Sequence, residues 1–569
     1  MANGCNQNPS GTCSEAEGVN TTASGNASHA EGFVTTASGN ASHTEGGSTN
    51  ASGEAAHAEG INTTASGPFS HAEGQATDAS GDNSHAEGLS TVASGNNSHA
   101  EGLSTTASGN SSHAEGAGTQ AIGGSSHAEG FNTIASSAAA HAEGSTTIAS
   151  EEAAHAEGFT TTASGFASHA EGRETNAFGE NSHAEGFQTT TGNAEDPTQG
   201  TNAHAEGFLT TASGNSSHAE GESTTASGSN SHAEGIGNFA GGRAAHVEGG
   251  GGSGVFGDQP NFANGASSHV EGLNTNVDST GLAAHAEGFD TQANDIAAHS
   301  EGLGTRANGV ASHTEGTGTR ADGSNSHAEG LNTNAQAFVN SHIMGRNGDA
   351  DENNSWFIGN GTSILVRGLG AKWSGTTFNM FVDGMYLSPA ADYAEMFETV
   401  DGNPIDVGYF VTTEEDKIRK ATASDQFILG ITSATPSLLG NSAGLRWHGK
   451  YATDEWGRKQ YHEVTVPAVT DKKGNVLIPE RKEMQVMLNP AWNSDEEYVP
   501  RTERPEWVAV GLIGQVLVRD DGTCEVNGYC KPNNEGIATT SNTGYRVMKR
   551  TGPNQVLILK DGTSIISKQ

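Results

Sequence analysis

A tetrapeptide, His-Ala-Glu-Gly, recurs through more than half of the chain at a fixed separation, and this periodicity constrains the fold more than any other feature. Consecutive histidines from His29 to His183 follow one another every 14 residues. The series continues with longer spacers to a degenerate copy at His342, and Glu15 occupies the histidine position of the first copy. So regular a period indicates a stack of equivalent units rather than a globule around one core.

Each unit has the form S-H-A-E-G-x-x-T-x-A-S-G-x-x, as in residues 28–41. Two glycines in every 14 residues are incompatible with a helical repeat, whereas short extended stretches that end in glycine turns are typical of strands. The chain is also only 33% hydrophobic, so a large conventional core is excluded. We predict an all-β fold in which each unit is one coil of two short strands, stacked in parallel.

A coil of 14 residues encloses very little volume. Alternation along the strand places Thr35 and Ala37 on one face, while His29 and Glu31 share another. A single chain built in this way has a small core for its surface. We therefore expect side-by-side association, most simply as a homotrimer.

Charge is distributed unevenly along the sequence. Residues 1–387 hold 7 Lys and Arg against 42 Asp and Glu, whereas residues 388–569 hold 20 against 25. Nucleic acids and anionic membranes are bound through Lys and Arg, so neither is an expected partner of so acidic a rod. No apolar run is long enough for membrane insertion, and the N-terminus has no signal-peptide pattern, so synthesis in a host cytoplasm without a signal peptide is expected.

The repeat places a histidine and a glutamate in the same two positions of successive coils. We expect these side chains to form a structural ladder in which His donates hydrogen bonds to Glu, and each Glu is expected to favour the protonated form of its neighbours. A metal-binding ladder and a catalytic His–Glu dyad remain open alternatives, but no metal site and no cofactor are expected. The first members of the ladder are His29, Glu31, His43, Glu45, His57 and Glu59.

The repeat pattern resembles the head of the YadA-type trimeric autotransporter adhesins, over roughly residues 14–345. That resemblance implies a left-handed parallel β-roll with two strands per turn. It departs from the family where the apolar pair of the strand is replaced here by His and Glu.

The composition changes after His342, where Trp, Tyr, Lys and Arg become frequent and glycine loses its 14-residue spacing. Apolar runs such as 507–518 and 555–559 predict a separate β-rich domain. The predicted parts are an N-terminal tip at 1–13, the repeat rod at 14–345, a β-rich transition segment at 346–387 and a C-terminal domain at 388–569.

A hydroxyl residue is followed by two carboxylates at the start of this last domain, in the sequence from Leu387 to Glu398. Together with 401–403, 430–433, 447–451, 454–458 and 504–508, the junction resembles the intramolecular-chaperone autoproteolytic cleavage domain of phage tailspikes and neck appendages. This family implies that the C-terminal domain drives trimerisation of a β-helical fibre and then removes itself in a glutamic-peptidase-like reaction.

Carried over to this chain, the resemblance implies scission between Leu387 and Ser388, with Ser388, Asp392 and Glu395 as the catalytic residues. Attack by an activated water and attack by the Ser388 hydroxyl both remain open. We expect a phage tail fibre or neck appendage in the virion or on an extracellular surface, which binds a host receptor such as a glycan or cell-wall component. The alternative is a trimeric adhesin-like bacterial or prophage protein whose C-terminal domain does not cut.

Overall fold

The structure is a computed structural model that describes residues 6–196, 198–250, 260–443, 449–470, 472–474, 476–495 and 497–562. The chain divides into a β-roll unit, Met1–Gly384, and a C-terminal unit, Met385–Gln569. This division lies three residues before the predicted boundary at 387. The all-β prediction is confirmed, with one short 3₁₀ turn, Arg501–Glu503, among the described residues. No helix in these described ranges is long and apolar enough to span a membrane.

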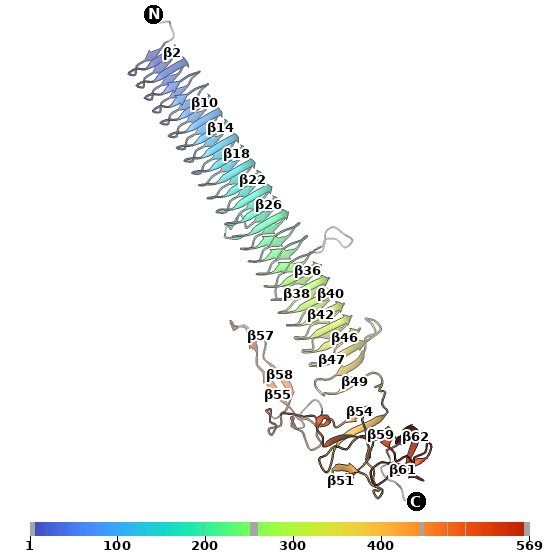
Figure 1. Cartoon of the computed structure of the whole chain (residues 1–569). Helices are drawn as coiled ribbons and strands as arrows, with labels where there is room; N and C mark the ends of the chain where they lie inside the picture. The colour runs from blue at the N-terminus through green and yellow to red at the C-terminus, as the bar shows by residue number, and fades with distance from the viewer. Residues whose placement is uncertain are drawn as a thin grey trace. The chain divides into compact units, whose positions relative to one another are not determined.

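Each coil of the β-roll unit contributes one strand to each of two parallel sheets, as predicted from the period. In the second coil these are β4 (His29–Phe33) and β5 (Thr36–Ala37). Successive coils pair in register, so that in β10 (His71–Gln75) and β12 (His85–Leu89) histidine lies beside histidine and glutamate beside glutamate. Figure 1 shows the resulting stack as regularly spaced arrows from the blue to the yellow part of the chain.

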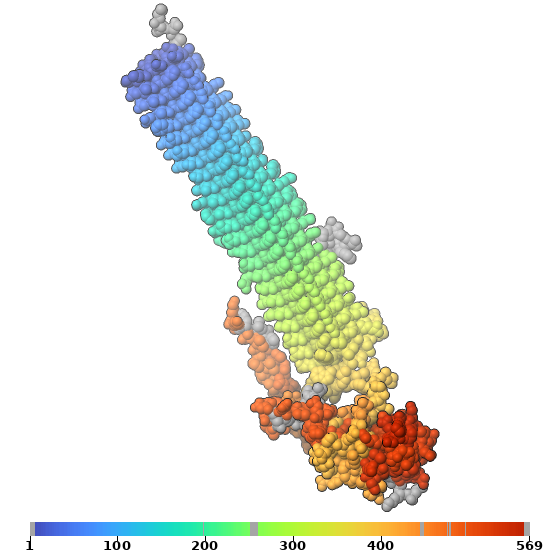
Figure 2. Space-filling view, viewed as in Figure 1, coloured from blue at the N-terminus to red at the C-terminus, as the bar shows by residue number. Residues whose placement is uncertain are grey.

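The interior of the roll is filled by small side chains. Ala30 and Ala37 are fully buried, and the same two positions form the core of nearly every coil. Thr35 is buried with them, and the buried Ser28 donates a hydrogen bond of 2.7 Å from its hydroxyl to the carbonyl of Gly25. Methyl and hydroxyl groups therefore take the place of a large apolar core, and the layers in Figure 2 are correspondingly thin and uniform.

The two glycines of a coil meet different requirements. Gly102, which follows the His-x-Glu strand, has φ +108°, and a Cβ there would lie 2.1 Å from the carbonyl oxygen of Gly116 in the next coil. Gly109, at the other corner, has no such backbone angle, although a Cβ there would lie 1.8 Å from the carbonyl oxygen of Gly123. The equivalent positions two and three coils later hold Ser137 and Glu151, so this corner admits other residues in some coils. The first corner therefore requires glycine for its backbone angle as well as for space.

The parallel roll continues past the last histidine of the series. Strand β46 (His342–Arg346) pairs in parallel with β47 (Trp356–Asn360), which keeps the register of the coils. Antiparallel strands β48 (Leu369–Trp373) and β49 (Met380–Val382) then close this end of the sheet. The segment after residue 345 is thus β-rich, and its first strand belongs to the roll.

The C-terminal unit is built on one mixed sheet of ten strands with an apolar core that includes Phe410, Ile431 and Ile558. Its longest strand is β59 (Trp507–Arg519), which pairs with β50, β53 (Gly430–Thr432) and β63 (Gln555–Lys560). Strand β50 (Asp392–Glu398) also runs parallel to β54 (Leu438–Gly440). The two predicted catalytic carboxylates both lie on β50.

Candidate functional site

The predicted scission point lies in extended chain just before β50. Leu387 is 87% exposed, and Ser388 is also exposed. The backbone N–H of Ala390 donates a hydrogen bond of 3.2 Å to the Ser388 hydroxyl, which bends the chain into a local turn. The peptide bond between Leu387 and Ser388 is therefore accessible.

Asp392, the first residue of β50, is only 4% exposed. Its backbone carbonyl accepts hydrogen bonds from the N–H and the hydroxyl of Ser437, at 2.8 and 2.6 Å, which fixes the start of the strand. Its Oδ2 atom is buried without a hydrogen-bond partner. A buried carboxylate oxygen without a partner is costly for stability, and such groups are frequent where a reaction needs a free acceptor.

Glu395 lies on the other face of the same strand. Side chains alternate along β50, so Asp392, Ala394 and Met396 are buried whereas Tyr393 and Glu395 are more exposed. The Tyr393 hydroxyl donates a hydrogen bond of 2.6 Å to Oε1 of Glu395, and this bond raises the pKa of Tyr393. Within one chain the two carboxylates therefore point away from each other.

A cavity of about 540 Å³ lies within the C-terminal unit, and Asp392 forms part of its wall. Pro389, Ala390 and Ala391 also line it, so the chain runs from the predicted scission point into this cavity. The other walls come from residues 407–408, 432–435, 515–517, 554–555, Arg519 and Leu557.

Sequence reasoning did not assign a role to the polar groups that face this cavity. Thr432 donates a hydrogen bond of 2.8 Å to the carbonyl of Asp406, and Arg519 Nε donates one of 2.8 Å to the carbonyl of Val407. Arg519 also pairs with the Asp406 carboxylate. Thr432 belongs to the 430–433 motif, which is one of the motifs that carry the family resemblance. This motif was therefore the sequence feature from which a cavity residue could have been predicted. Other motif residues, Trp447 and His448, lie outside the described residues.

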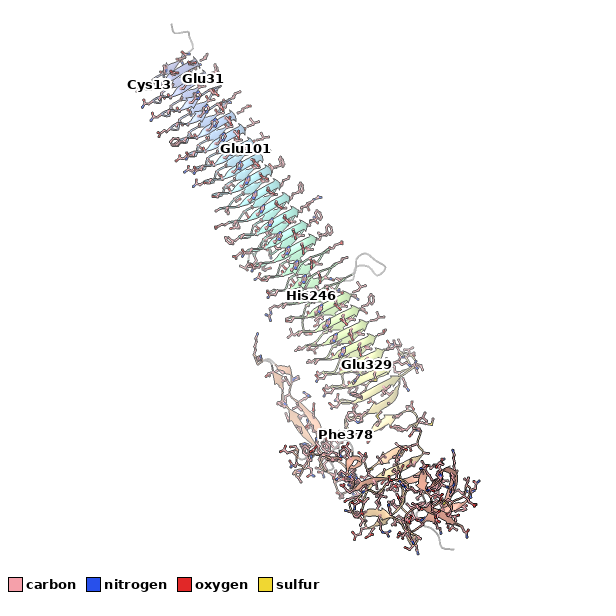
Figure 3. The ribbon with its side chains drawn as sticks, viewed as in Figure 1. Cys13, Glu31, Glu101, His246, Glu329 and Phe378 are labelled. Atoms are coloured by element: carbon pink, nitrogen blue, oxygen red, sulfur yellow. The ribbon has the colours of Figure 1, made fainter. Side chains whose placement is uncertain are left out.

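The histidines of the β-roll unit lie one above another along the coils. Among the described residues, the predicted hydrogen bond between His and Glu is formed at four of them, His99, His218, His232 and His246. The rings of His29, His43 and His57 stack at centroid distances of 4.9 and 4.7 Å. Figure 3 labels Glu31 and three further members at increasing distance along the roll.

The pKa of several ladder histidines is lowered, and His43 and His57 show the causes. Burial and the neighbouring imidazoles lower the pKa of His43, and they lower the pKa of His57 as well. The adjacent glutamates raise the pKa of both groups but do not offset these causes. The glutamates therefore act in the predicted direction, but burial and the neighbouring imidazoles outweigh them at His43 and His57.

Comparison with known proteins concerns mainly the C-terminal part. Residues 330–555 match the family model described as Peptidase_G2, IMC autoproteolytic cleavage domain. The pre-neck appendage protein of Bacillus phage B103 is 39% identical over 163 residues, which cover 29% of this chain and 17% of that protein. The putative phage-related protein YobO of Bacillus subtilis (strain 168) is 34% identical over 171 residues, which cover 30% of this chain and 20% of that protein.

Among solved structures, a C-terminal fragment of bacteriophage phi29 gene product 12 is 31% identical, with a TM-score of 0.24, and covers 30% of this chain and 99% of the fragment. The matches to the two curated relatives span a fifth or less of their length. The family resemblance predicted from the junction motifs is confirmed for this part of the chain: residues 330–555, which begin within the last coils of the β-roll, match the IMC autoproteolytic cleavage domain of the Peptidase_G2 family.

Proposed function

We propose that the chain is a trimeric fibre protein of the phage neck-appendage kind, whose C-terminal unit directs assembly and then removes itself by cutting between Leu387 and Ser388. The observation that carries this proposal is the match of residues 330–555 to an autoproteolytic family. The exposed Leu387–Ser388 bond, followed four residues later by the buried and unpartnered Asp392, supports the position of the cut. Relatives named as pre-neck appendage proteins of Bacillus phages support a place in the virion.

The free Oδ2 of Asp392 suits the role of general base. In the first route, Asp392 accepts a proton from a water that attacks the Leu387 carbonyl, and a carboxylic acid then donates a proton to the departing Ser388 nitrogen. The resemblance makes Glu395 the other acid/base residue, so with Asp392 as the base Glu395 takes this second role. Since β50 presents the two carboxylates on opposite faces, a site shared between two copies of the chain is the simplest way to bring both to one bond.

The second route uses the Ser388 hydroxyl as the nucleophile. Its oxygen attacks the Leu387 carbonyl, the C–N bond breaks, and the hydroxyl proton passes to the freed amine, which leaves an ester that water hydrolyses. Asp392 would again accept the proton during attack. Either route gains from the fixed position of the bond within the same chain, and one turnover is sufficient.

Association of the rods is supported by an exposed apolar row on the β-roll unit. The residue after the first corner glycine is large and apolar in many coils, with exposed fractions of 59% at Phe33, 55% at Ile61 and 55% at Phe131. The row is interrupted by smaller or polar residues, such as Gln75 and Arg173, but exposed apolar side chains recurring along a rod whose own core is mostly alanine are typical of an interface between chains. A trimer would cover this row, and the remaining surface would present the host receptor site, for which we propose a glycan or cell-wall component as ligand.

The reaction is tested by following scission of freshly expressed protein in denaturing gels, with the new N-terminus identified by sequencing. Wild type should yield a fragment that begins at Ser388, and Asp392→Asn should slow its formation about 100-fold or more. The control Asp495→Asn, which changes an exposed aspartate of the same unit, should cut at the wild-type rate. Ser388→Ala separates the routes, because only attack by water survives this substitution.

A non-cutting trimeric adhesin of a bacterium or prophage is the second candidate function. The relative YobO, a putative phage-related protein of a Bacillus subtilis strain, supports the prophage origin in this candidate. This candidate predicts that the wild-type chain is never cut, so that wild type and Asp392→Asn both keep the full-length mass.

A further inference from the structure

The His–Glu ladder contains buried ring nitrogens that have no hydrogen-bond partner. The His218, His232 and His246 Nε2 atoms lie 3.2–3.3 Å from a glutamate of the preceding coil, and His99 is similar. In the remaining coils the separation is larger, for example 3.5 Å for His71 and Glu59. The Nε2 atoms without a partner are those of His29, His43, His57, His71, His85, His113, His127, His141, His155, His169, His183, His204, His269, His285, His299, His313, His327 and His342.

The carboxylates opposite these nitrogens also lack a fixed counter-charge. In the described residues of the β-roll unit, the ion pairs of Arg and Lys are made with other acidic groups, such as Arg320 with Asp322 and Arg367 with Asp349. Among the described residues the ladder glutamates form ion pairs with histidines alone, at distances from 3.2 Å for His232 and Glu220 to 4.0 Å for His43 and Glu31, and none is paired with Lys or Arg. A row of carboxylates at the spacing of parallel strands therefore calls for cations.

Ligand atoms of adjacent coils come close enough to share an ion. The side chains of His71, Glu73 and His85 each offer one ligand atom, and these three atoms lie within 4.8 Å of one another. The same arrangement recurs from His85 to His99 and in the three successive pairs of coils from His141 to His183. Two imidazoles and a carboxylate form a donor set that suits Zn²⁺ and its first-row neighbours.

We propose that the ladder is a linear array of binding sites for divalent transition-metal ions, each site made of two histidines from adjacent coils and at least one intervening glutamate. Bonds of about 2.1 Å in tetrahedral geometry place ligand atoms about 3.4 Å apart. The rings of His71 and His85 are 4.8 Å apart, so the two ring tips must approach each other at an occupied site. This movement widens the gaps on either side, and ions therefore occupy alternate pairs of coils.

The same occupancy balances the charge. Two coils supply two glutamates, which one divalent ion neutralises. With 22 histidines from His29 to His342, this arrangement predicts about ten ions per chain. A groove of about 690 Å³ runs along Glu287, Glu301, Glu315 and Glu329 and leaves the carboxylate row open to ions from solvent.

Titration of metal-free protein with Zn²⁺ in equilibrium dialysis tests the proposal. The preparation need not be full-length, because the ladder lies within 29–342, and the outcome is independent of self-cleavage. We expect about ten ions per chain, with two imidazole nitrogens per ion in the X-ray absorption spectrum. Fewer than about three ions per chain, or a spectrum without imidazole ligands, would overturn the array.

Two sets of ladder variants and one control locate the ions. Replacement of four consecutive histidines by Gln should remove about two ions; these are His99, His113, His127 and His141. The second set replaces the glutamates of the same coils by Gln; these are Glu101, Glu115, Glu129 and Glu143. It should also lower the number of bound ions. Because it keeps the stack of imidazole rings, it tests the proposal even if the first set fails to fold. His462→Gln, an exposed histidine of the C-terminal unit, should leave binding unchanged. Wild-type stoichiometry in both ladder sets would contradict the proposal.

Discussion

Strand alternation decides what each side chain of β50 can do. Asp392 faces the interior with a free Oδ2, and Glu395 faces outward in a hydrogen bond with Tyr393. The sequence spacing of three residues already places two side chains on opposite faces of a strand. These two carboxylates can therefore act on one peptide bond only if Asp392 comes from one chain and Glu395 from another. Cleavage would then depend on assembly.

The Tyr393 hydroxyl provides a test of the part that Glu395 plays. Tyr393→Phe removes the donor that holds Oε1 of Glu395 and keeps the ring. We expect self-cleavage to slow about 10-fold, since a freed carboxylate samples other orientations, with an unchanged melting temperature. Gel time courses of both proteins measure this. If the variant is cut at the wild-type rate, then Glu395 either does not need the hydrogen bond from Tyr393 or takes no part in the cleavage reaction.

A pH dependence of stability follows from an ion pair of the C-terminal unit. The hydrogen bonds from Arg419 and, to a lesser extent, from Thr422 lower the pKa of Asp425 to about 2. Because this value lies below that of an unfolded chain, the pair stabilises the unit above about pH 4, and the contribution is lost as the pH falls toward 2. After allowance for the partly exposed Arg419, it is worth about 2 kcal/mol.

Urea unfolding of the Asp392→Asn chain, followed by tryptophan fluorescence between pH 6 and pH 2.5, measures this contribution. Asp425→Asn in the same background should lose about 2 kcal/mol at pH 6 and about a third of that at pH 2.5, just above the folded pKa of about 2. An equal loss at both pH values would show that charge on Asp425 is not the cause.

At the scale of the single coil, the two corner glycines differ in how strictly they are required. Gly102→Ala places a Cβ against the next coil and forces alanine to φ +108°, so we expect a loss of more than about 3 kcal/mol. Gly109→Ser needs no such backbone angle, but its Cβ would also lie 1.8 Å from a carbonyl oxygen, that of Gly123, so we expect a loss about 1–2 kcal/mol smaller than that of Gly102→Ala. Guanidinium unfolding of both variants makes the comparison, and equal losses would contradict the assignment of the corners.

The coils could be predicted from sequence because period, glycine corners and strand alternation are local properties. His29 and Glu31 fall two residues apart, which fixes them on one face whatever the rest of the chain does. The burial of Asp392 could not be predicted in this way, since it depends on pairing with β59, more than a hundred residues later. The missing partners of the ladder nitrogens depend on differences of a few tenths of an ångström, which no sequence pattern encodes.

For the whole molecule, a stack of near-identical coils has a register problem during folding. His71 can pair with His85 or, after a slip of one coil, with His99 at almost the same energy. A C-terminal unit that associates first would align three chains before the coils close, and its later removal would leave a rod that is stable for kinetic reasons. This account explains why a fibre would carry a part that it discards.

Refolding distinguishes this role from simple attachment. The uncut Asp392→Asn protein, denatured in guanidinium and diluted, should recover its trimeric mass. The rod that remains after the wild-type cut should aggregate or stay monomeric under the same conditions. Equal recovery of both would show that the C-terminal unit does not guide assembly.

The central claim is that the chain cuts itself once, before Ser388, after it has assembled. Intact mass under denaturing conditions, recorded on freshly expressed wild type beside Asp392→Asn and followed by native mass of the larger product, tests this claim most directly. The account predicts masses for residues 1–387 and 388–569 in wild type alone, with the larger fragment as a trimer. A wild-type chain that keeps the mass of all 569 residues would contradict it.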